Sequence, residues 1–157
     1  MIVKRELSIP FTTALKKLIE LDHDAMGAYE VALHRLENKE YKRMFEEFKR
    51  DHERHMNEIA KFLRLYNEIP PTKFRLKSFL SQGKSSLLTL SGDKAILYAM
   101  RSYELDMNEA YTRIIRYDDK KIPQPLQRTL QQGLQDDRCH LNWIENKLLN
   151  EINQNKG

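Results

Sequence analysis

The stretch FEEFKRDHERHMNEIAKF, residues 45–62, repeats apolar side chains at the 3- and 4-residue spacing of one helix face. The apolar members of this stripe are Phe45, Phe48, Ile59 and Phe62. The pentad DHERH, residues 51–55, occupies its middle and places both of its histidines on the same stripe. A second pentad with Asp first and His fifth, DDRCH, occurs at residues 136–140. Whether these polar side chains face solvent or the core therefore bears on both fold and function.

Composition predicts a single helix-rich domain spanning residues 1–157. The chain is 40% hydrophobic and 32% charged, with 5 Gly and 5 Pro, a balance typical of soluble globular proteins. No apolar run approaches the roughly 20 residues that cross a bilayer. The start, MIVKRELSIP, has no apolar segment of signal-peptide length, so we expect a cytoplasmic location. Cys139 is the single cysteine, which excludes an internal disulfide.

The net charge of +4 is concentrated in one segment. Residues 71–92 hold four basic residues and no acidic one; the remaining 27 − 4 = 23 basic residues equal the 23 acidic ones. The four are Lys73, Arg75, Lys77 and Lys84. Four charges can attract an anionic partner, but they are too few to argue for nucleic acid. We interpret the segment as a solvated or subunit-contacting connection.

Apolar periodicity predicts helices over about 11–36, 40–67, 93–118 and 124–152. Asn38 is expected to cap the second helix, and Ser91 or Asp93 the third. Pro70 and Pro71 end the second helix, and the connection over 68–92 is too long for a tight turn. A short helix is expected inside it, around Phe74 to Leu80. The fold class is therefore all-α, a four-helix bundle of two antiparallel hairpins joined by a long crossover.

Residues that can bind metal interrupt each apolar stripe near its middle. They are Asp22 in the first helix, His52 and His55 in the second, Glu104 in the third, and Asp137 and His140 in the fourth. With the hairpin turns centred near Asn38 and Lys121, all six lie 14 to 19 residues from their turn. At about 1.5 Å rise per residue they share one depth in the bundle. Because a buried charge is costly unless paired or coordinated, the spacing predicts one inward cluster.

The two halves of the sequence echo each other around this cluster. Asp22 precedes Tyr29 by seven residues, as Glu104 precedes Tyr111. The pairs His52/His55 and Asp137/His140 share the i, i+3 spacing that places both members on one helix face. Asp51 and Asp136 each precede a histidine by four residues. The pattern indicates a duplicated helical hairpin.

At these residues the chain resembles the ferritin-like superfamily of di-iron and di-manganese carboxylate proteins, especially its rubrerythrin-like and uncharacterised bacterial branches. Such bundles take one Glu from each of two helices and a Glu-x-x-His pair from each of the other two. DHERH is similar to the family's Asp-Glu-x-Arg-His motif at Asp51, Arg54 and His55, with His52 in place of Glu. DDRCH is similar at Asp136 and His140. The resemblance spans essentially the whole chain.

The resemblance implies a non-haem metal site, with iron expected and manganese or zinc as alternatives. The implied ligands are Asp22, His52, His55, Glu104, Asp137 and His140. Asp51 and Asp136 would orient the ligand histidines, and Tyr29 and Tyr111 would be hydrogen-bonding or redox neighbours. The implied activity is metal oxidation, or peroxide and oxygen handling, of the di-iron oxidoreductase type.

Departures from the family pattern leave the occupancy of the site open. The chain supplies three carboxylates where the family has four, and His52 cannot bridge two metals as a carboxylate does. The site then holds two metals asymmetrically, holds one, or is vestigial. The rival hypothesis is a metal-free interaction or stress-associated protein, in which histidines and aspartates form a polar core layer. We expect Cys139 to pack between helices rather than bind metal, and Trp143 to face a second subunit in a homodimer.

Overall fold

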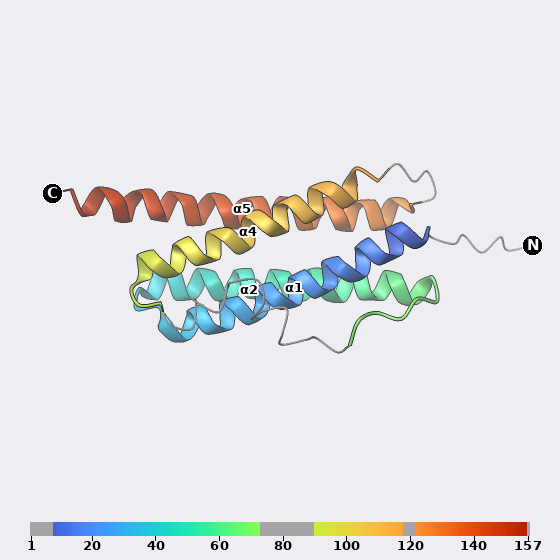
Figure 1. Cartoon of the computed structure of the whole chain (residues 1–157), viewed down its shortest axis with the longest axis horizontal. Helices are drawn as coiled ribbons and strands as arrows, with labels where there is room; N and C mark the ends of the chain where they lie inside the picture. Colours follow the sequence, from blue (N-terminus) through green and yellow to red (C-terminus); the bar gives the residue numbers. More distant parts are fainter. Residues whose placement is uncertain (1–7, 73–89, 118–121, 157) are drawn as a thin grey trace, which may run out of the picture.

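The computed structural model describes residues 8–72, 90–117 and 122–156, and helices account for most of them (Figure 1). Within these residues the helices are α1 (Ile9–Arg35), α2 (Lys39–Leu65), α4 (Asp93–Ile115) and α5 (Gln124–Gln154). The predicted all-α class is confirmed, and the helix ends that differ from the predicted ones do so by one to three residues. Among the described residues, no helix has the length and apolarity needed to span a membrane.

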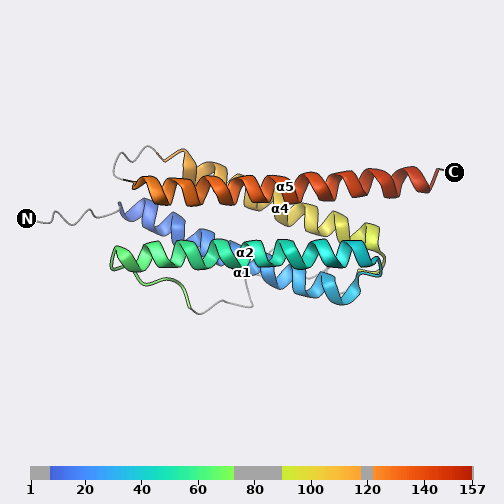
Figure 2. The same ribbon diagram turned by 180° about the vertical axis from the view of Figure 1, so that it is seen from behind.

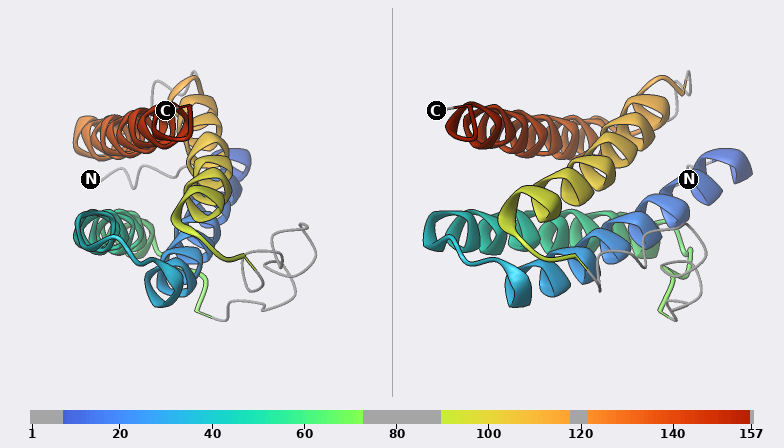
Figure 3. Two further views of the ribbon diagram at one scale, coloured as in Figure 1. Left: turned by 90° about the vertical axis from the view of Figure 1, so that its left-hand side faces the viewer. Right: turned by 60° about the vertical axis from the view of Figure 1, so that its left-hand side comes forward.

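The helices pair as two antiparallel hairpins, α1 with α2 and α4 with α5 (Figure 2). Between the hairpins, α1 packs on α4 and α2 packs on α5, which gives the four-helix bundle seen end-on in Figure 3. The α2–α4 connection starts where α2 ends and reaches α4 at the opposite end of the bundle. The end of α2 and the start of α4 thus lie at opposite ends of the bundle, and the 27 residues of α2 extend about 40 Å. The basic residues 73–84 and the helix predicted at 74–80 lie outside the described residues.

The hairpin turns explain where two of the helices begin. The Asn38 side chain accepts hydrogen bonds from the backbone N–H groups of Glu40 (2.9 Å) and Tyr41 (3.1 Å), so the predicted cap of α2 is confirmed. The predicted cap of the third helix is wrong, because Gly92 is the N-cap of α4, with φ of 90° and no side-chain cap. The Asp93 carboxylate instead accepts from the backbone N–H groups of Glu37 (2.8 Å) and Asn38 (3.0 Å). Asp93 thus fastens the start of α4 to the α1–α2 turn.

Two apolar clusters fill the bundle, one toward each end. The first contains Phe11, Leu15, Leu18, Ile59, Leu63, Met107, Ile114, Leu126 and Leu130. The second contains Ala32, Leu36, Phe45, Phe48, Ile96, Leu97, Met100, Ile144 and Leu148. The interrupted positions of all four stripes lie between these clusters, so a polar layer divides the apolar core.

The prediction for Cys139 on α5 is wrong, because this side chain is exposed and does not pack between helices. Trp143 is half-buried, and its ring is in edge contact with Tyr41, Phe45 and Phe48 of α2 at centroid distances of 5.5 to 6.2 Å. Its contact with a second subunit stays a prediction. This aromatic group helps hold α2 against α5.

Candidate metal centre

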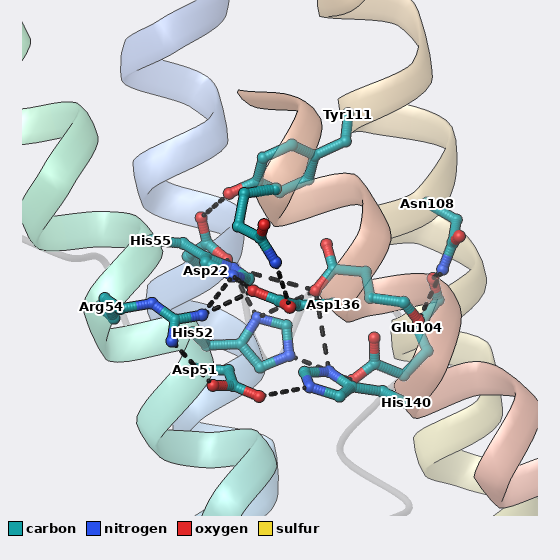
Figure 4. Close-up of polar contacts among 12 residues, drawn as sticks. Asp22, Asp51, His52, Arg54, His55, Glu104, Asn108, Tyr111, Asp136 and His140 are labelled. Carbon is teal, nitrogen blue, oxygen red and sulfur yellow. Dashed lines mark hydrogen bonds and ion pairs between the residues drawn. The ribbon is translucent and has the colours of Figure 1, made fainter. Parts of the chain in front are cut away.

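The six residues predicted to face inward come together in the core from all four helices (Figure 4). Asp22, His52, Glu104 and Asp137 are 0% exposed, His140 is 1% and His55 is 2%. Ionisable side chains are almost never this buried unless they are paired or coordinated. The layer is therefore held by specific polar contacts rather than by solvation.

His52 lies between a carboxylate of α1 and a carboxylate of α4, the helices through which one hairpin packs on the other. Its Nδ1 is 2.9 Å from Asp22 Oδ1 on α1, and its Nε2 is 3.0 Å from Glu104 Oε1 on α4. An ionised carboxylate can only accept a hydrogen bond. Both ring nitrogens of His52 therefore donate, and the ring links α1 to α4 through α2.

The other two histidines are each held by an aspartate of the sister pentad. His55 Nε2 is 2.9 Å from Asp136 Oδ2, and His140 Nε2 is 2.9 Å from Asp51 Oδ2. The resemblance implied that Asp51 and Asp136 contact histidines, and the structure shows which ones, so that α2 and α5 are tied in both directions. A carboxylate on Nε2 fixes the ring so that Nδ1 is the nitrogen that faces the cluster.

Two buried tyrosines hold the carboxylates of the opposite hairpin. The Tyr29 hydroxyl on α1 donates to Glu104 Oε1 on α4. The Tyr111 hydroxyl on α4 donates to Asp22 Oδ2 on α1, at 2.9 Å. Both rings are 0% exposed. Tyr29 thus contacts the acid seven residues before Tyr111, and Tyr111 contacts the acid seven residues before Tyr29.

These contacts are reciprocal, so the cluster has approximate two-fold symmetry between the hairpins. Asp22 corresponds to Glu104, and His55 corresponds to His140. The symmetry fails at one inner position, where α2 carries His52 and α5 carries Asp137. It also fails at the fourth residue of the pentad, Arg54 on α2 against Cys139 on α5. The α1–α2 half is therefore poorer in carboxylate than the α4–α5 half.

Several buried atoms of the cluster have no hydrogen-bond partner in the part of the chain that the structure describes. They are Nδ1 of His55, Nδ1 of His140, Oε2 of Glu104, and Oδ1 and Oδ2 of Asp137. Asp137 Oδ1 lies 3.8, 3.9 and 3.7 Å from the Nδ1 atoms of His52, His55 and His140. Unpaired buried polar atoms are rare and unfavourable. Their convergence on one carboxylate gives a site of metal-ligand character.

Two overlapping groups within the cluster bring ligand atoms within 4.8 Å of one another. One consists of His52, Glu104, Asp137 and His140; the other consists of Asp22, His52 and His55. Nitrogen and carboxylate oxygen donors of this kind suit iron, manganese or zinc. The cluster is compatible with a metal ion.

Burial and the neighbouring charges shift the ionisation of the inner residues. Burial raises the pKa of Asp137 to about 8, and the carboxylates of Glu104 and Asp22 add to the rise. Burial opposes the protonated form of His55, yet contacts with Asp136 and Asp22 raise its pKa to about 9. Burial also opposes ionisation of Glu104, but the charge of His52 outweighs it and holds the pKa of Glu104 below its usual range. The cluster therefore shares protons among its members.

We predict that the metal-free protein loses stability as pH rises from about 6.5 to 9. The folded-state pKa values of His55 (6.5 to about 9) and Asp137 (3.8 to about 8) are both raised. In this window the folded chain keeps protons that the unfolded chain has lost, so the free energy of unfolding falls, by on the order of a few kcal/mol. Urea unfolding at pH 6.5 and 9 measures this. Equal stability at both values would contradict the prediction.

Sequence reasoning missed three side chains that support the cluster. The sequence identifies Arg54 only as a match to the family motif, but its guanidinium donates to Asp136 and lies 3.2 Å from Asp51. It therefore clamps both aspartates that hold histidines, and its match to the family motif was the available signal. Asn108 donates to the backbone carbonyls of Glu104 (2.7 Å) and Asp137 (3.2 Å), joining α4 to α5. Its position four residues after Glu104 is a weak signal.

The third missed side chain is Phe48, whose ring stacks on His140. The ring centroids are 4.1 Å apart with an interplanar angle of 28°. Phe48 was predicted only as a core residue of the α2 stripe. Its position one turn before His52 does not reveal that it covers a ring from α5. The stacking fixes the plane of His140 in addition to its contact with Asp51.

Gly133 leaves room for the Tyr111 ring, and we predict that Gly133→Ala displaces that ring. A Cβ at residue 133 would lie 2.5 Å from Tyr111 Cε1 and 2.9 Å from Cζ. We expect loss of the hydrogen bond to Asp22 and destabilisation by about 1–3 kcal/mol. Gly27→Ala is the matched control, because nothing lies within 4 Å of its Cβ and alanine favours a helix interior by about 1 kcal/mol. Equal stabilisation of both variants would contradict this account.

The fold and the cluster together define the class, a four-helix bundle with a buried His/Asp/Glu cluster able to hold a metal. The chain belongs to the family described as a domain of unknown function (DUF2383), whose profile matches residues 11–117. This match covers α1, α2 and α4 with Asp22, His52, His55 and Glu104, and it ends before α5. A search of the curated proteins finds no significant match.

Proposed function

We propose that the protein is a ferritin-like metal-binding protein whose buried cluster holds a divalent transition metal, with iron expected and manganese or zinc as alternatives. The observation that carries the proposal is the set of unpaired donor atoms around Asp137, namely its own oxygens, Glu104 Oε2 and Nδ1 of His55 and His140. Leaving these atoms unpaired in a dry core is unfavourable. Glu104, Asp137 and His140 belong, with His52, to one group whose ligand atoms lie within 4.8 Å of one another, so a cation there would be a partner for several of them.

The surroundings of the histidines support this proposal. Histidines that bind metal commonly donate their second ring N–H to a carboxylate. Asp136 and Asp51 accept from His55 and His140 in this way, and Arg54 neutralises part of their charge. A polar layer serving only helix register would not need to leave both Nδ1 atoms without a partner.

Helix order and connectivity support the ferritin-like assignment. Two hairpins whose α2 end and α4 start lie at opposite ends of the bundle, with inward acids on α1 and α4 and i, i+3 pairs on α2 and α5, follow the pattern of the di-metal carboxylate bundles. We propose that residues 1–157 act as one such domain. The departure at His52 concerns the number of metals rather than the arrangement of helices.

Bound iron would supply the redox chemistry for Fe(II) oxidation or for the handling of peroxide and oxygen. The chain's own residues would bind and orient it: Glu104, Asp137 and His140 supply donor atoms from α4 and α5. The Tyr29 and Tyr111 hydroxyls hold Glu104 Oε1 and Asp22 Oδ2 and fix these carboxylates. The Phe48 ring, 5% exposed, covers His140 and keeps water from that side.

The test is metal analysis of protein purified without chelator, followed by anaerobic titration with Fe(II), Mn(II) and Zn(II). We expect close to stoichiometric metal and affinity that rises with pH, because ligands must lose protons to bind. Protein that stays metal-free after this titration would contradict the proposal and favour the metal-free polar layer. Metal binding without Fe(II) oxidation or peroxide consumption would contradict only the redox part.

A further inference from the structure

We infer that the metal ion enters the cluster between α2 and α5, past the carboxylates of Asp51 and Asp136, and that the guanidinium of Arg54 closes this entrance. The inference rests on the proposed metal-binding function and adds to it a route and a residue that controls the route. These three side chains, which lie between the buried histidines and the surface, are called the α2–α5 entrance below (Figure 4).

A route is needed because the cluster itself is closed to solvent. Its six inner side chains are at most 2% exposed, and the two apolar clusters fill the bundle toward its two ends. A divalent ion does not cross an apolar core, because removing an ion from water without replacement ligands is very costly. The ion therefore needs polar side chains that take the place of its water on the way in.

Asp51 and Asp136 form a polar path of this kind. One carboxylate oxygen of Asp51 lies 2.9 Å from Nε2 of the buried His140, and Asp136 has the same relation to His55. Yet the two aspartate side chains are 31% and 18% exposed, so each carboxylate reaches from the dry layer to solvent. The two tyrosine rings whose hydroxyls also contact the layer are 0% exposed. In addition, α2 and α5 form the least extensive of the four helix pairings in the bundle.

Arg54 covers both carboxylates of the entrance. Its Nη2 donates to Asp136 Oδ2, and its Nη1 lies 3.2 Å from Asp51 Oδ1. Because a guanidinium keeps its positive charge in proteins, it both obstructs the entrance and repels a divalent cation that approaches. Without it, the two carboxylates would attract the cation. The entrance is therefore closed in the arrangement that the structure shows.

Arg54 has room and a partner for a second position. Its side chain is 45% exposed and lines an open depression of about 430 Å³ on the surface of α2, together with Arg50 and Glu58. Glu58 lies one turn further along the helix, at the i, i+4 spacing at which opposite charges pair. Rotation of the Arg54 side chain would exchange the two aspartates for Glu58 without moving a core residue. The entrance is open when Arg54 occupies this second position.

The test is the rate of metal uptake by metal-free protein, measured by stopped-flow absorption with Co(II), whose visible spectrum changes when side chains replace its water. We expect Arg54→Gln to take up Co(II) about 10-fold faster than the wild type, the factor that corresponds to losing roughly 1.4 kcal/mol of charge-assisted contacts from the barrier. A variant that merely loosened the ligands would release metal faster without taking it up faster. Arg54→Lys keeps the charge but not the fork that spans two carboxylates, so its rate should lie between the two.

The matched control is Arg50→Gln, which removes the same charge one turn earlier in the same depression. Arg50 Nε donates to the backbone carbonyl of Glu46 at 3.2 Å, away from the entrance, so uptake should stay at the wild-type rate. Glu58→Gln tests the open position from the opposite direction. It should slow uptake by about two-fold, the effect of losing one exposed i, i+4 ion pair.

The outcomes separate this inference from the proposed function. Uptake by Arg54→Gln at the wild-type rate, in protein that binds Co(II) at equilibrium, would overturn the inference and leave the proposed function standing. Equal acceleration in Arg50→Gln and Arg54→Gln would assign the effect to surface charge and would also overturn the inference. Failure of the wild type to bind any Co(II), Fe(II), Mn(II) or Zn(II) at equilibrium would overturn both.

Discussion

Metal binding is expected to disappear from the double variant His55→Ala with His140→Ala. Both rings direct an unpaired Nδ1 toward Asp137, and the substitution removes the histidine donors from both halves of the cluster. Residues that merely orient metal ligands contribute about 10- to 100-fold in affinity, so loss of the ligands themselves should exceed 100-fold. Elemental analysis after dialysis measures the fall, from about one ion per chain to nearly none.

The matched control for this experiment is His34→Ala. His34 is an exposed histidine on α1, and its Nε2 lies 3.4 Å from Oε1 of Glu30. Its removal should leave the metal content unchanged. Circular dichroism of both variants establishes that the helices are intact. Retention of stoichiometric metal in a folded double variant would show that the metal lies elsewhere.

Metal binding is also expected to raise the melting temperature by on the order of 10 °C. A ligand at about 1,000 times its Kd stabilises the folded state by about 4 kcal/mol, and each kcal/mol shifts a domain of this size by about 2–4 °C. The stabilisation arises because the unfolded chain does not assemble donors from α1, α2, α4 and α5. Differential scanning calorimetry with and without Zn(II) measures the shift.

Chelation provides the reversal of that experiment. Excess chelator should return the melting temperature of the wild type to its metal-free value. The variant His140→Ala should show little shift with Zn(II) at any stage, while Glu46→Gln, an exposed substitution on α2, should behave as the wild type. A melting temperature that does not respond to metal, in protein shown to be folded, would indicate that the polar layer is satisfied without one.

The helices and the inward cluster could be predicted because each depends on local periodicity. The stripe through Phe45, Phe48, His52 and His55 identifies a helix face regardless of what packs against it. Equal distance from the hairpin turns placed Asp22 and Glu104 at the same depth, since helix rise is constant. The repeat of one pentad in two helices drew attention to Asp51 and Asp136 as partners of histidines, and the structure pairs Asp51 with His140.

The supporting contacts could not be predicted, because they depend on how the helices meet. Asp93 looks like a helix cap in sequence, but the α1–α2 turn offers its carboxylate two backbone N–H groups. Arg54 lies on the exposed side of α2, and only the approach of α5 puts Asp136 within its reach. Cys139 is next to the buried His140 in sequence, but its own side chain is exposed among the residues that the structure describes.

The orientation of His52 is the detail with the largest consequence that the sequence left open. Its position on the stripe predicted a ring that faces the core, but an inward ring is compatible with a site that holds two metals, one metal or none. In the structure its nitrogens lie 2.9 and 3.0 Å from oxygens of Asp22 and Glu104, so the ring contacts an acid of α1 on one side and an acid of α4 on the other. Side-chain packing across three helices determines this orientation, and no local pattern encodes it.

Anomalous diffraction from crystals grown with Fe(II) or Mn(II), measured on both sides of the metal's absorption edge, tests the central claim most directly. The account predicts an anomalous peak inside the bundle, among the six buried side chains of Asp22, His52, His55, Glu104, Asp137 and His140. A map with no peak within the cluster, in crystals of protein saturated with metal, would contradict it.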